Sequence, residues 1–104
     1  MKTELFNEDG TWKRNDSYTS ILQLDKMLTS NNIPHTLIEF MDGWQILYFD
    51  SSGNRVGDVV EHYGSYGHES DLMEVYGFCL PEPSGWLSVE ETFEFFKNVH
   101  DKGE

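Results

Sequence analysis

A two-residue turn signal at Asp42 and Gly43 constrains the fold of this chain more than any other feature. It separates two runs rich in β-branched and aromatic residues, 35–41 and 44–50. An Asp-Gly pair between such runs is typical of a type I′ turn, because both central positions of that turn need positive φ. The pattern therefore predicts an antiparallel hairpin in the middle of the chain.

Two further β-type runs follow the hairpin closely. A second turn signal covers residues 51–54, a third run covers residues 55–62, and a fourth covers residues 72–78. Short links favour pairing between strands that are neighbours in sequence, so we expect a four-stranded antiparallel meander. The run 44–50 has apolar side chains at both odd and even positions, which is typical of a central strand covered on one face.

Helical patterns lie on both sides of these runs. Between residues 17 and 31 the apolar side chains recur at steps of three and four, with Asp16 or Ser17 available as the N-cap. A capping box begins at Ser88, whose side chain accepts from the amide of Glu91 while the Glu91 carboxylate reaches back. The sequence thus predicts an α+β fold, a four-stranded antiparallel β-sheet flanked by an N-terminal and a C-terminal α-helix.

The chain of 104 residues fits a single domain, 1–104, with one hydrophobic core. We expect residues 1–16 to be a loosely docked arm or a short strand, with a turn at 7–10, and residues 101–104 to be a tail. Residues 80–86 contain two prolines and a glycine and are interpreted as a loop.

The single cysteine, Cys79, excludes an internal disulfide and fits a reducing cytoplasm. Because Cys79 ends an apolar run, we interpret it as a buried structural thiol. The first residues lack an apolar signal-peptide core, and no run approaches the 18 apolar residues of a membrane span, so we expect a cytoplasmic protein.

The charge of the chain restricts its partners. The net charge is −12 at pH 7, and between residues 56 and 96 there are nine acids and no Lys or Arg. Binding to nucleic acid or to an anionic membrane depends on cationic side chains that contact phosphate. We therefore expect no direct contact with nucleic acid or membranes and favour a basic protein partner.

The nine-residue connection between the third and fourth β-type runs is the part of the sequence that packing explains least. Its two glycines suit turns with positive φ, and they would display Tyr63, Tyr66 and His68 on a loop of fixed shape. Trp86 and Phe95, together with Tyr66, are left over from the core pattern. These three aromatic residues are candidates for an exposed contact.

We interpret the acids of this region as a surface that imitates the phosphate spacing of nucleic acid. Such a surface would occupy the basic groove of a nucleic-acid-binding protein, and electrostatic steering would make the binding fast and salt-sensitive. A merely soluble acidic surface is the simpler alternative. The candidate partner-binding residues are Asp58, Glu61, Tyr63, Tyr66, His68, Glu69, Asp71, Glu74, Glu90, Glu91 and Glu94.

Metal binding and catalysis are the lesser alternatives. His62, His68, Glu69 and Asp71 lie within ten residues, and imidazole with carboxylate suits zinc, but the spacing matches no named metal motif. The chain also lacks a nucleophile elbow, a P-loop and a dinucleotide-binding pattern. We therefore expect no enzyme, no catalytic residue and no cofactor, with a metal-dependent enzyme kept as the alternative.

Three stretches resemble a family of small acidic proteins from phages and prophages of Gram-positive bacteria. They are LDKMLTSNNIPHT at 24–36, DGWQILY at 42–48 and DVVEHYGSYGHESDLMEVYGF at 58–78. The resemblance covers residues 20–98 and transfers no catalytic residue. It implies a protein that blocks host defence, such as an anti-CRISPR protein or DNA mimic acting on a CRISPR nuclease in the host cytoplasm. An accessory phage protein that binds another protein, or forms a homodimer through an open sheet edge, is the alternative.

Overall fold

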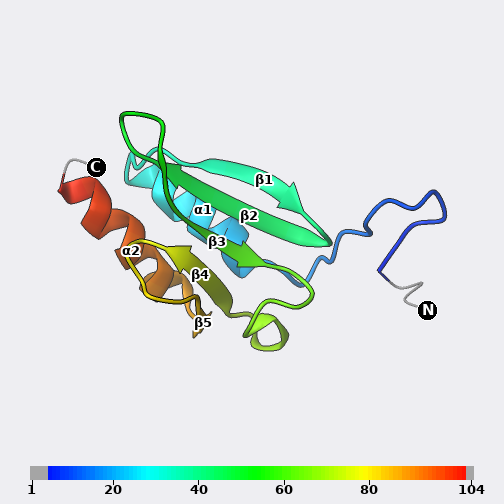
Figure 1. Ribbon diagram of the computed structural model, residues 1–104. Helices are drawn as coiled ribbons and strands as arrows, with labels where there is room; N and C mark the ends of the chain where they lie inside the picture. Colours follow the sequence, from blue (N-terminus) through cyan, green and yellow to red (C-terminus); the bar gives the residue numbers. More distant parts are fainter. Residues whose placement is uncertain (1–4, 103–104) are drawn as a thin grey trace.

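The computed structural model describes residues 5–102 and shows, within that range, a five-stranded antiparallel sheet with two α-helices on one face (Figure 1). The strands lie in sequence order, β1-β2-β3-β4-β5, so the predicted antiparallel meander with two helices is confirmed. Neither described helix is long and apolar enough to cross a membrane. The elements are α1 (Ser20–Ser30), β1 (Thr36–Phe40), β2 (Gly43–Phe49), β3 (Arg55–Glu61), the 3-10 turn η1 (His68–Ser70), β4 (Met73–Gly77), β5 (Ser84–Leu87) and α2 (Val89–Asp101).

The prediction of four strands is wrong in one respect, because β5 lies where a loop was expected. β5 pairs with β4 through Met73 and Leu87 and through Val75 and Ser84, with an irregularity between the two pairs. The segment that forms β5 has only four residues, one of them a glycine, so the sequence shows no alternation of apolar and polar side chains there. β5 therefore forms through backbone pairing with β4, and its side-chain pattern does not predict it.

The turn between β1 and β2 lies one residue earlier than predicted. Phe40 pairs with Gly43, so the central residues are Met41 and Asp42, and of these two Met41 has positive φ, at 53°. Gly43 is instead the first residue of β2. A larger residue does not fit there, because a Cβ atom would collide with the carbonyl oxygen of Glu61 on β3. The glycine permits the close approach of two strands, and the type I′ assignment is wrong.

The core fills the space between the sheet and the two helices. Tyr48 on the interior strand β2 contacts Phe96 of α2 edge-on, with ring centroids 5.9 Å apart. Burial of these large apolar side chains is the main favourable contribution to folding. The fully or nearly fully buried apolar residues include Ile21, Leu24, Leu28, Ile33, Ile46, Tyr48, Val59, Met73, Val75, Phe78, Phe93 and Phe96.

Helix α1 starts later than predicted and is capped in another way. Its N-cap residue is Thr19, whose side chain makes no capping bond to any described residue. The carboxylate of Glu61, which arrives from β3, accepts a hydrogen bond from the backbone amide of Ile21 at 3.0 Å. The prediction of Asp16 or Ser17 as the cap is therefore wrong.

Helix α2 starts as predicted. The hydroxyl of Ser88 accepts from the Glu91 amide at 3.2 Å, and the Glu91 carboxylate accepts from the Ser88 amide at 2.8 Å, which completes the capping box. Phe95 departs from the prediction, because it is half-buried and its ring lies 5.7 Å from that of Phe78. Phe95 therefore packs against the core and does not form an exposed contact.

The N-terminal arm projects beyond the end of the sheet (Figure 1). Phe6 and Trp12 form an isolated antiparallel bridge, with ring centroids 4.5 Å apart. Arg14 joins the arm to the β1–β2 turn, because its guanidinium donates to the carbonyl oxygens of Met41 and Gly43. At the other end, the expected tail at 101–104 lies partly outside the described residues, and Asp101 still belongs to α2.

Cys79 is exposed, so its interpretation as a buried thiol is wrong. It lies in the turn after β4 with φ of 67°, and its neighbour Phe78, which also has positive φ, is the residue that turns into the core. The apolar run that led to the prediction ends at this turn. Because the chain changes direction there, Phe78 is buried in the core while Cys79 is exposed to solvent.

Candidate protein-binding surface

Hydrogen bonds hold the start of the loop that follows β3. The hydroxyl of Ser65 accepts from the His62 amide at 3.2 Å and donates to the His62 carbonyl at 2.9 Å. The amide of Tyr63 donates to the carboxylate of Asp42, which is buried in the β1–β2 turn, at 2.8 Å. The bond to Asp42 attaches the start of the loop to the neighbouring hairpin.

The middle of the same loop packs backbone to backbone against β5. The amide of Trp86 donates to the carbonyl oxygen of Tyr66 at 3.2 Å. A Cβ atom on Gly67 would lie 3.0 Å from the Cα atom of Trp86, and one on Gly85 would collide with the Cβ atom of Tyr66. The absence of side chains on these two glycines therefore lets Tyr66 and Trp86 lie next to each other.

Three aromatic side chains of this region are exposed to solvent. The exposed fractions are 65% for Tyr66, 56% for Trp86 and 45% for Tyr63. Trp86 also has φ of 60°, in the left-handed region that large side chains rarely adopt. Strain of this kind costs stability and is concentrated at functional sites, so Trp86 is the strongest candidate for a contact residue.

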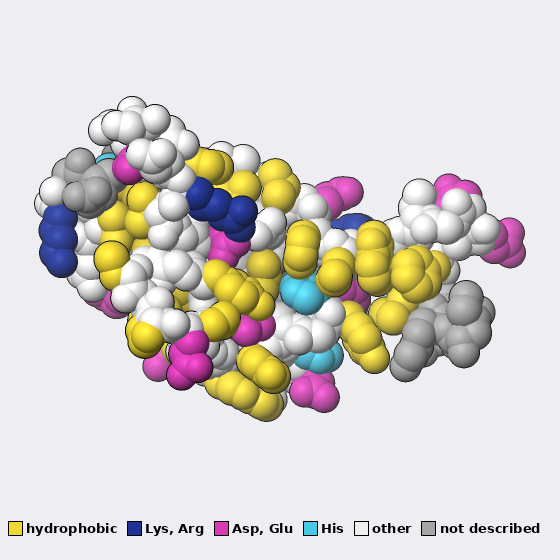
Figure 2. Space-filling model, in the orientation of Figure 1, with side chains coloured by type: hydrophobic (Ala, Val, Ile, Leu, Met, Phe, Trp, Pro, Cys, Tyr) yellow, Lys and Arg dark blue, Asp and Glu magenta, His cyan; other side chains and the backbone are white. Residues whose placement is uncertain are grey.

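Exposed acids accompany these aromatic residues. Glu69 and Asp71 belong to the same loop, and Glu90 and Glu91 lie in the first turn of α2, which follows β5 directly. Figure 2 shows acidic side chains interspersed with hydrophobic ones along the lower edge of the molecule, where η1 and β5 lie. We name this set the acidic–aromatic surface, and it consists of Tyr63, Tyr66, Glu69, Asp71, Trp86, Glu90 and Glu91.

The carboxylates of this surface are not neutralised by neighbouring cations. Within residues 5–102, the ion pairs join Asp25 to His35, Asp58 to Arg55 and Asp101 to Lys97. Arg55 is the only Lys or Arg between residues 27 and 96, and its guanidinium is bound to Asp58. The acids of the acidic–aromatic surface therefore have no cationic ion-pair partner among the described residues.

Three of the predicted contact acids are buried, which corrects the candidate set. Asp58 accepts from Gln45 and Arg55, Glu61 accepts from the amide of Ile21, and Glu74 accepts from the amide of Tyr66 at 3.1 Å. Each carboxylate holds two segments of the fold together. The structure buries these three carboxylates, so none of them belongs to the acidic–aromatic surface.

The remaining predicted residues lie at the margin of the surface. His68 is half-buried, and its ring lies 5.9 Å from that of Tyr63 and 6.3 Å from that of Tyr18. His68 therefore lies in contact with Tyr63 and is not itself fully exposed. Glu94 is exposed on α2, one turn beyond Glu90 and close in sequence to the Lys97–Asp101 ion pair.

The histidines of the loop have protein partners in this structure. The Nδ1 atom of His62 donates to the carbonyl oxygen of Tyr63 at 2.6 Å, since a carbonyl oxygen can only accept. Within the described part of the chain, no group of three or more His, Cys, Asp or Glu side chains is arranged to hold a metal ion.

Burial perturbs the pKa of two groups near this surface. Burial raises the pKa of Glu61 to about 7, against the opposing effect of the Ile21 amide, and the negative charge of Asp71 raises it further. Burial also raises the pKa of Tyr76, and the carboxylate of Glu74 adds to this increase.

The sequence did not predict the burial of the Asp58, Glu61 and Glu74 carboxylates. It also did not predict that Asp42 anchors the loop, because Asp42 was interpreted only as a turn residue.

No family model, curated protein or solved structure matches this chain. The resemblance to small phage proteins therefore stays a prediction.

Proposed function

We propose that this protein binds a basic surface of a nucleic-acid-handling protein and inhibits it stoichiometrically. The observation that carries the proposal is the pairing of exposed Tyr66 and Trp86 with unneutralised acids in a region without free cations. Tyrosine and tryptophan are enriched among the residues that dominate binding energy at interfaces. Carboxylates around them would steer a cationic partner and disfavour nucleic acid.

The chemistry of the surface suits arginine in particular. A guanidinium stacks on the faces of tryptophan and tyrosine, and it forms charge-assisted hydrogen bonds with carboxylates. Tyr66 and Trp86 would supply the stacking faces, and Glu69 or Asp71 the carboxylate. Proteins that hold nucleic acid present arginine and lysine in their grooves, so such a groove offers the complementary chemistry.

The resemblance to small phage proteins suggests a host nuclease, such as a CRISPR effector, as the target. Inhibition would take place in the host cytoplasm and would need no catalysis, because occupation of the groove excludes the nucleic acid. One inhibitor molecule would then block one enzyme molecule.

The decisive experiment is competition against fluorescent nucleic acid bound to a purified CRISPR nuclease. We expect this protein to displace the nucleic acid and to lose affinity steeply as the salt concentration rises. The double variant Glu69→Gln, Asp71→Asn should bind more weakly and with a smaller salt dependence. Glu39→Gln removes one exposed acid on β1, outside the acidic–aromatic surface, and is the charge-matched control for each of the single variants Glu69→Gln and Asp71→Asn.

Two outcomes would contradict the proposal. One is affinity that does not change with salt, and the other is a Glu39→Gln variant that weakens binding as much as the loop variants do.

Self-association is the second candidate, and the position of β1 favours it. In the described structure β1 pairs with β2 alone and is an edge strand, and its Ile38 side chain is exposed. An unpaired edge can add a strand from a second copy. Sedimentation measurements over a range of concentrations would show a dimer in that case, and a mass that stays monomeric would exclude it.

A further inference from the structure

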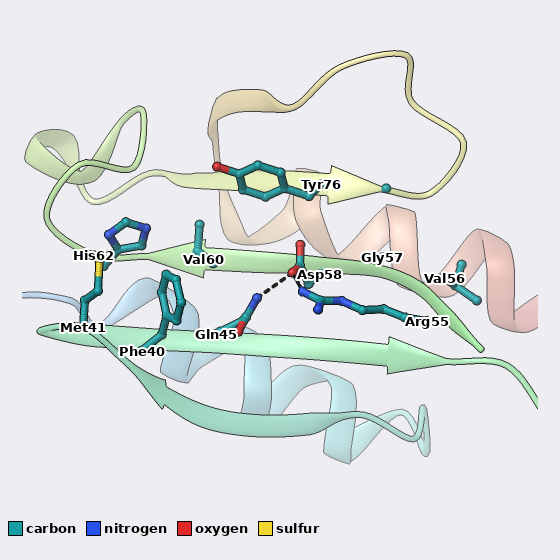
Figure 3. Close-up of a pocket in the computed structure, with 11 residues that line it drawn as sticks. Phe40, Met41, Gln45, Arg55, Val56, Gly57, Asp58, Val60, His62 and Tyr76 are labelled. Carbon is teal, nitrogen blue, oxygen red and sulfur yellow. Dashed lines mark hydrogen bonds and ion pairs between the residues drawn. The ribbon is translucent and has the colours of Figure 1, made fainter. Parts of the chain in front are cut away.

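A groove of about 650 Å³ crosses the face of the sheet that the helices leave open (Figure 3). Phe40 and Met41 form one end, Tyr76 of β4 forms one side, and Val60 of β3 forms part of the floor. Its volume lies in the range of small-molecule sites, and its walls are mostly aromatic and aliphatic. None of its lining residues belongs to the acidic–aromatic surface.

A buried carboxylate with one free oxygen lies in the floor of this groove. Asp58 is 4% exposed, and its Oδ2 atom accepts from the side chains of Gln45 and Arg55. Its Oδ1 atom has no hydrogen-bond partner among the described residues. Figure 3 shows the side of the carboxylate away from these two donors turned toward the strand that carries Tyr76.

An unpaired buried acceptor is unusual, because it has lost water without gaining a donor. A carboxylate accepts as many as about four hydrogen bonds, so the existing bonds to Gln45 and Arg55 leave capacity for another donor. Oδ1 is closed to solvent in this conformation, so a bound molecule that supplies an N–H group would satisfy it once a neighbouring side chain, such as that of Tyr76 on the paired strand, moves aside. The free oxygen therefore indicates the polar end of a ligand.

The charge of the groove indicates the sign of that ligand. Asp58 and Glu74 both lie on the open face of the sheet, since they alternate with Val59 and Val75 of the core. Asp58 lines the groove and is paired with Arg55, whose guanidinium is about half exposed. Glu74 lies beside the lining, on β4 opposite Val60, and has no ion-pair partner among the described residues. The net charge of the whole chain, −12, adds to the attraction of cations and the repulsion of anions.

The geometry points to a small planar cation, an aryl amidine or a protonated arylamine, as the ligand of this groove. We propose that its N–H group donates to Oδ1 of Asp58 while its ring lies against the ring of Tyr76 and the side chain of Val60. The aromatic and aliphatic walls bury the ring, and the carboxylate pairs with the charge. This site goes beyond the proposed binding of a protein partner and does not depend on it.

Benzamidine is a suitable probe, and its binding is measured by titration of the ¹H–¹⁵N spectrum of the protein. We expect saturable shifts at Gln45, Asp58 and Tyr76, with a dissociation constant of about 1 mM, as is usual for a fragment of this size. Benzoate has the same ring and the opposite charge, and it should give no saturable shifts. Asp58→Asn should weaken benzamidine binding at least about tenfold, because a charge-assisted hydrogen bond is lost.

Two further variants keep the test decisive. Tyr76→Ala removes one side of the groove at an exposed position and should also weaken binding, even where Asp58→Asn fails to fold. Glu39→Gln removes an acid outside the groove and should bind as the parent does. Equal binding of benzoate and benzamidine, full binding by folded Asp58→Asn or by Tyr76→Ala, or shifts confined to other surfaces would overturn the proposal.

Discussion

The Oε1 atom of Glu61 in β3 accepts a hydrogen bond from the backbone amide of Ile21, the second residue of α1, at 3.0 Å. A carboxylate from the sheet therefore caps the helix that packs on it. Its other oxygen, Oε2, has no hydrogen-bond partner among the described residues. The bond joins the two layers of the fold and leaves an acid buried in the core.

This acid should make stability depend on pH. Burial raises the folded-state pKa of Glu61 from 4.5 to about 7, so the folded state holds a proton that the unfolded state has already released. The free energy of unfolding should therefore fall as pH rises from 4.5 to about 7 and then level off, by about 3 kcal/mol in all. Urea unfolding at a series of pH values measures this slope.

The variant Glu61→Gln tests the origin of the slope. Its amide oxygen can still accept from Ile21, and it carries no charge, so the part of the slope between pH 4.5 and 7 should disappear. At pH 8 the variant should be more stable than the parent by about 1–3 kcal/mol. Glu94→Gln, at an exposed position, should keep the parent slope, and an unchanged slope in Glu61→Gln would assign the effect to other groups.

Gly85→Ala should disturb the acidic–aromatic surface through its backbone. The added Cβ atom would collide with that of Tyr66, and such overpacking costs about 1–3 kcal/mol. The change should also alter the fluorescence of Trp86 and weaken partner binding. Gly53→Ala is the control, because the added Cβ atom meets open space. The φ of +86° at this position should lower the stability of the variant, but the fluorescence of Trp86 and the binding of the partner should not change.

The backbone conformation at Trp86 should make glycine a better replacement than alanine. Its φ of 60° costs a side chain about 1–2 kcal/mol and costs glycine little, so Trp86→Gly should be more stable than Trp86→Ala by about 1 kcal/mol. Both variants should lose affinity for the partner. Thermal unfolding compares the two, and an alanine variant at least as stable as the glycine variant would show that no strain is stored there.

Arg14 should stabilise the junction between the N-terminal arm and the sheet. Its guanidinium donates to two carbonyl oxygens of the β1–β2 turn and lies 5.8 Å from the centre of the Trp44 ring. Arg14→Ala should lower the free energy of unfolding by about 1–2 kcal/mol, since hydrogen bonds to a charged group are lost. Lys13→Ala, at an exposed neighbouring position, should change it by less than about 0.5 kcal/mol, and equal effects would contradict the role of Arg14.

The sequence predicted those parts of the fold that local patterns determine. Strands β1 to β4 follow from alternating β-branched and aromatic residues, and the start of α2 follows from the capping box of Ser88 and Glu91. In each case the residues that form the signal are close neighbours in the chain. The exposed Tyr63, Tyr66 and Trp86 were also found, because no core pattern accounted for them.

The remaining features depend on contacts between distant residues. Glu61 caps a helix that begins about forty residues earlier in the sequence. Position 43 requires glycine because of the close approach of β3, a strand outside the β1–β2 hairpin that the turn signal predicts. Asp58 and Glu74 appear in the sequence as surface acids, and their burial depends on the loop and the side chains that cover them. No local pattern distinguishes a buried carboxylate of this kind from a solvated one.

The sequential order of the strands has a consequence for folding kinetics. Each strand pairs with the strand that precedes it, so the sheet can grow through short loop closures, which are rapid. The contact between α1 and α2 joins residues 20–30 to residues 89–101, on the two sides of the strands in the sequence. A nascent chain on the ribosome therefore leaves Tyr48 and Phe78 uncovered until Phe96 emerges, and chaperones would recognise it until that moment.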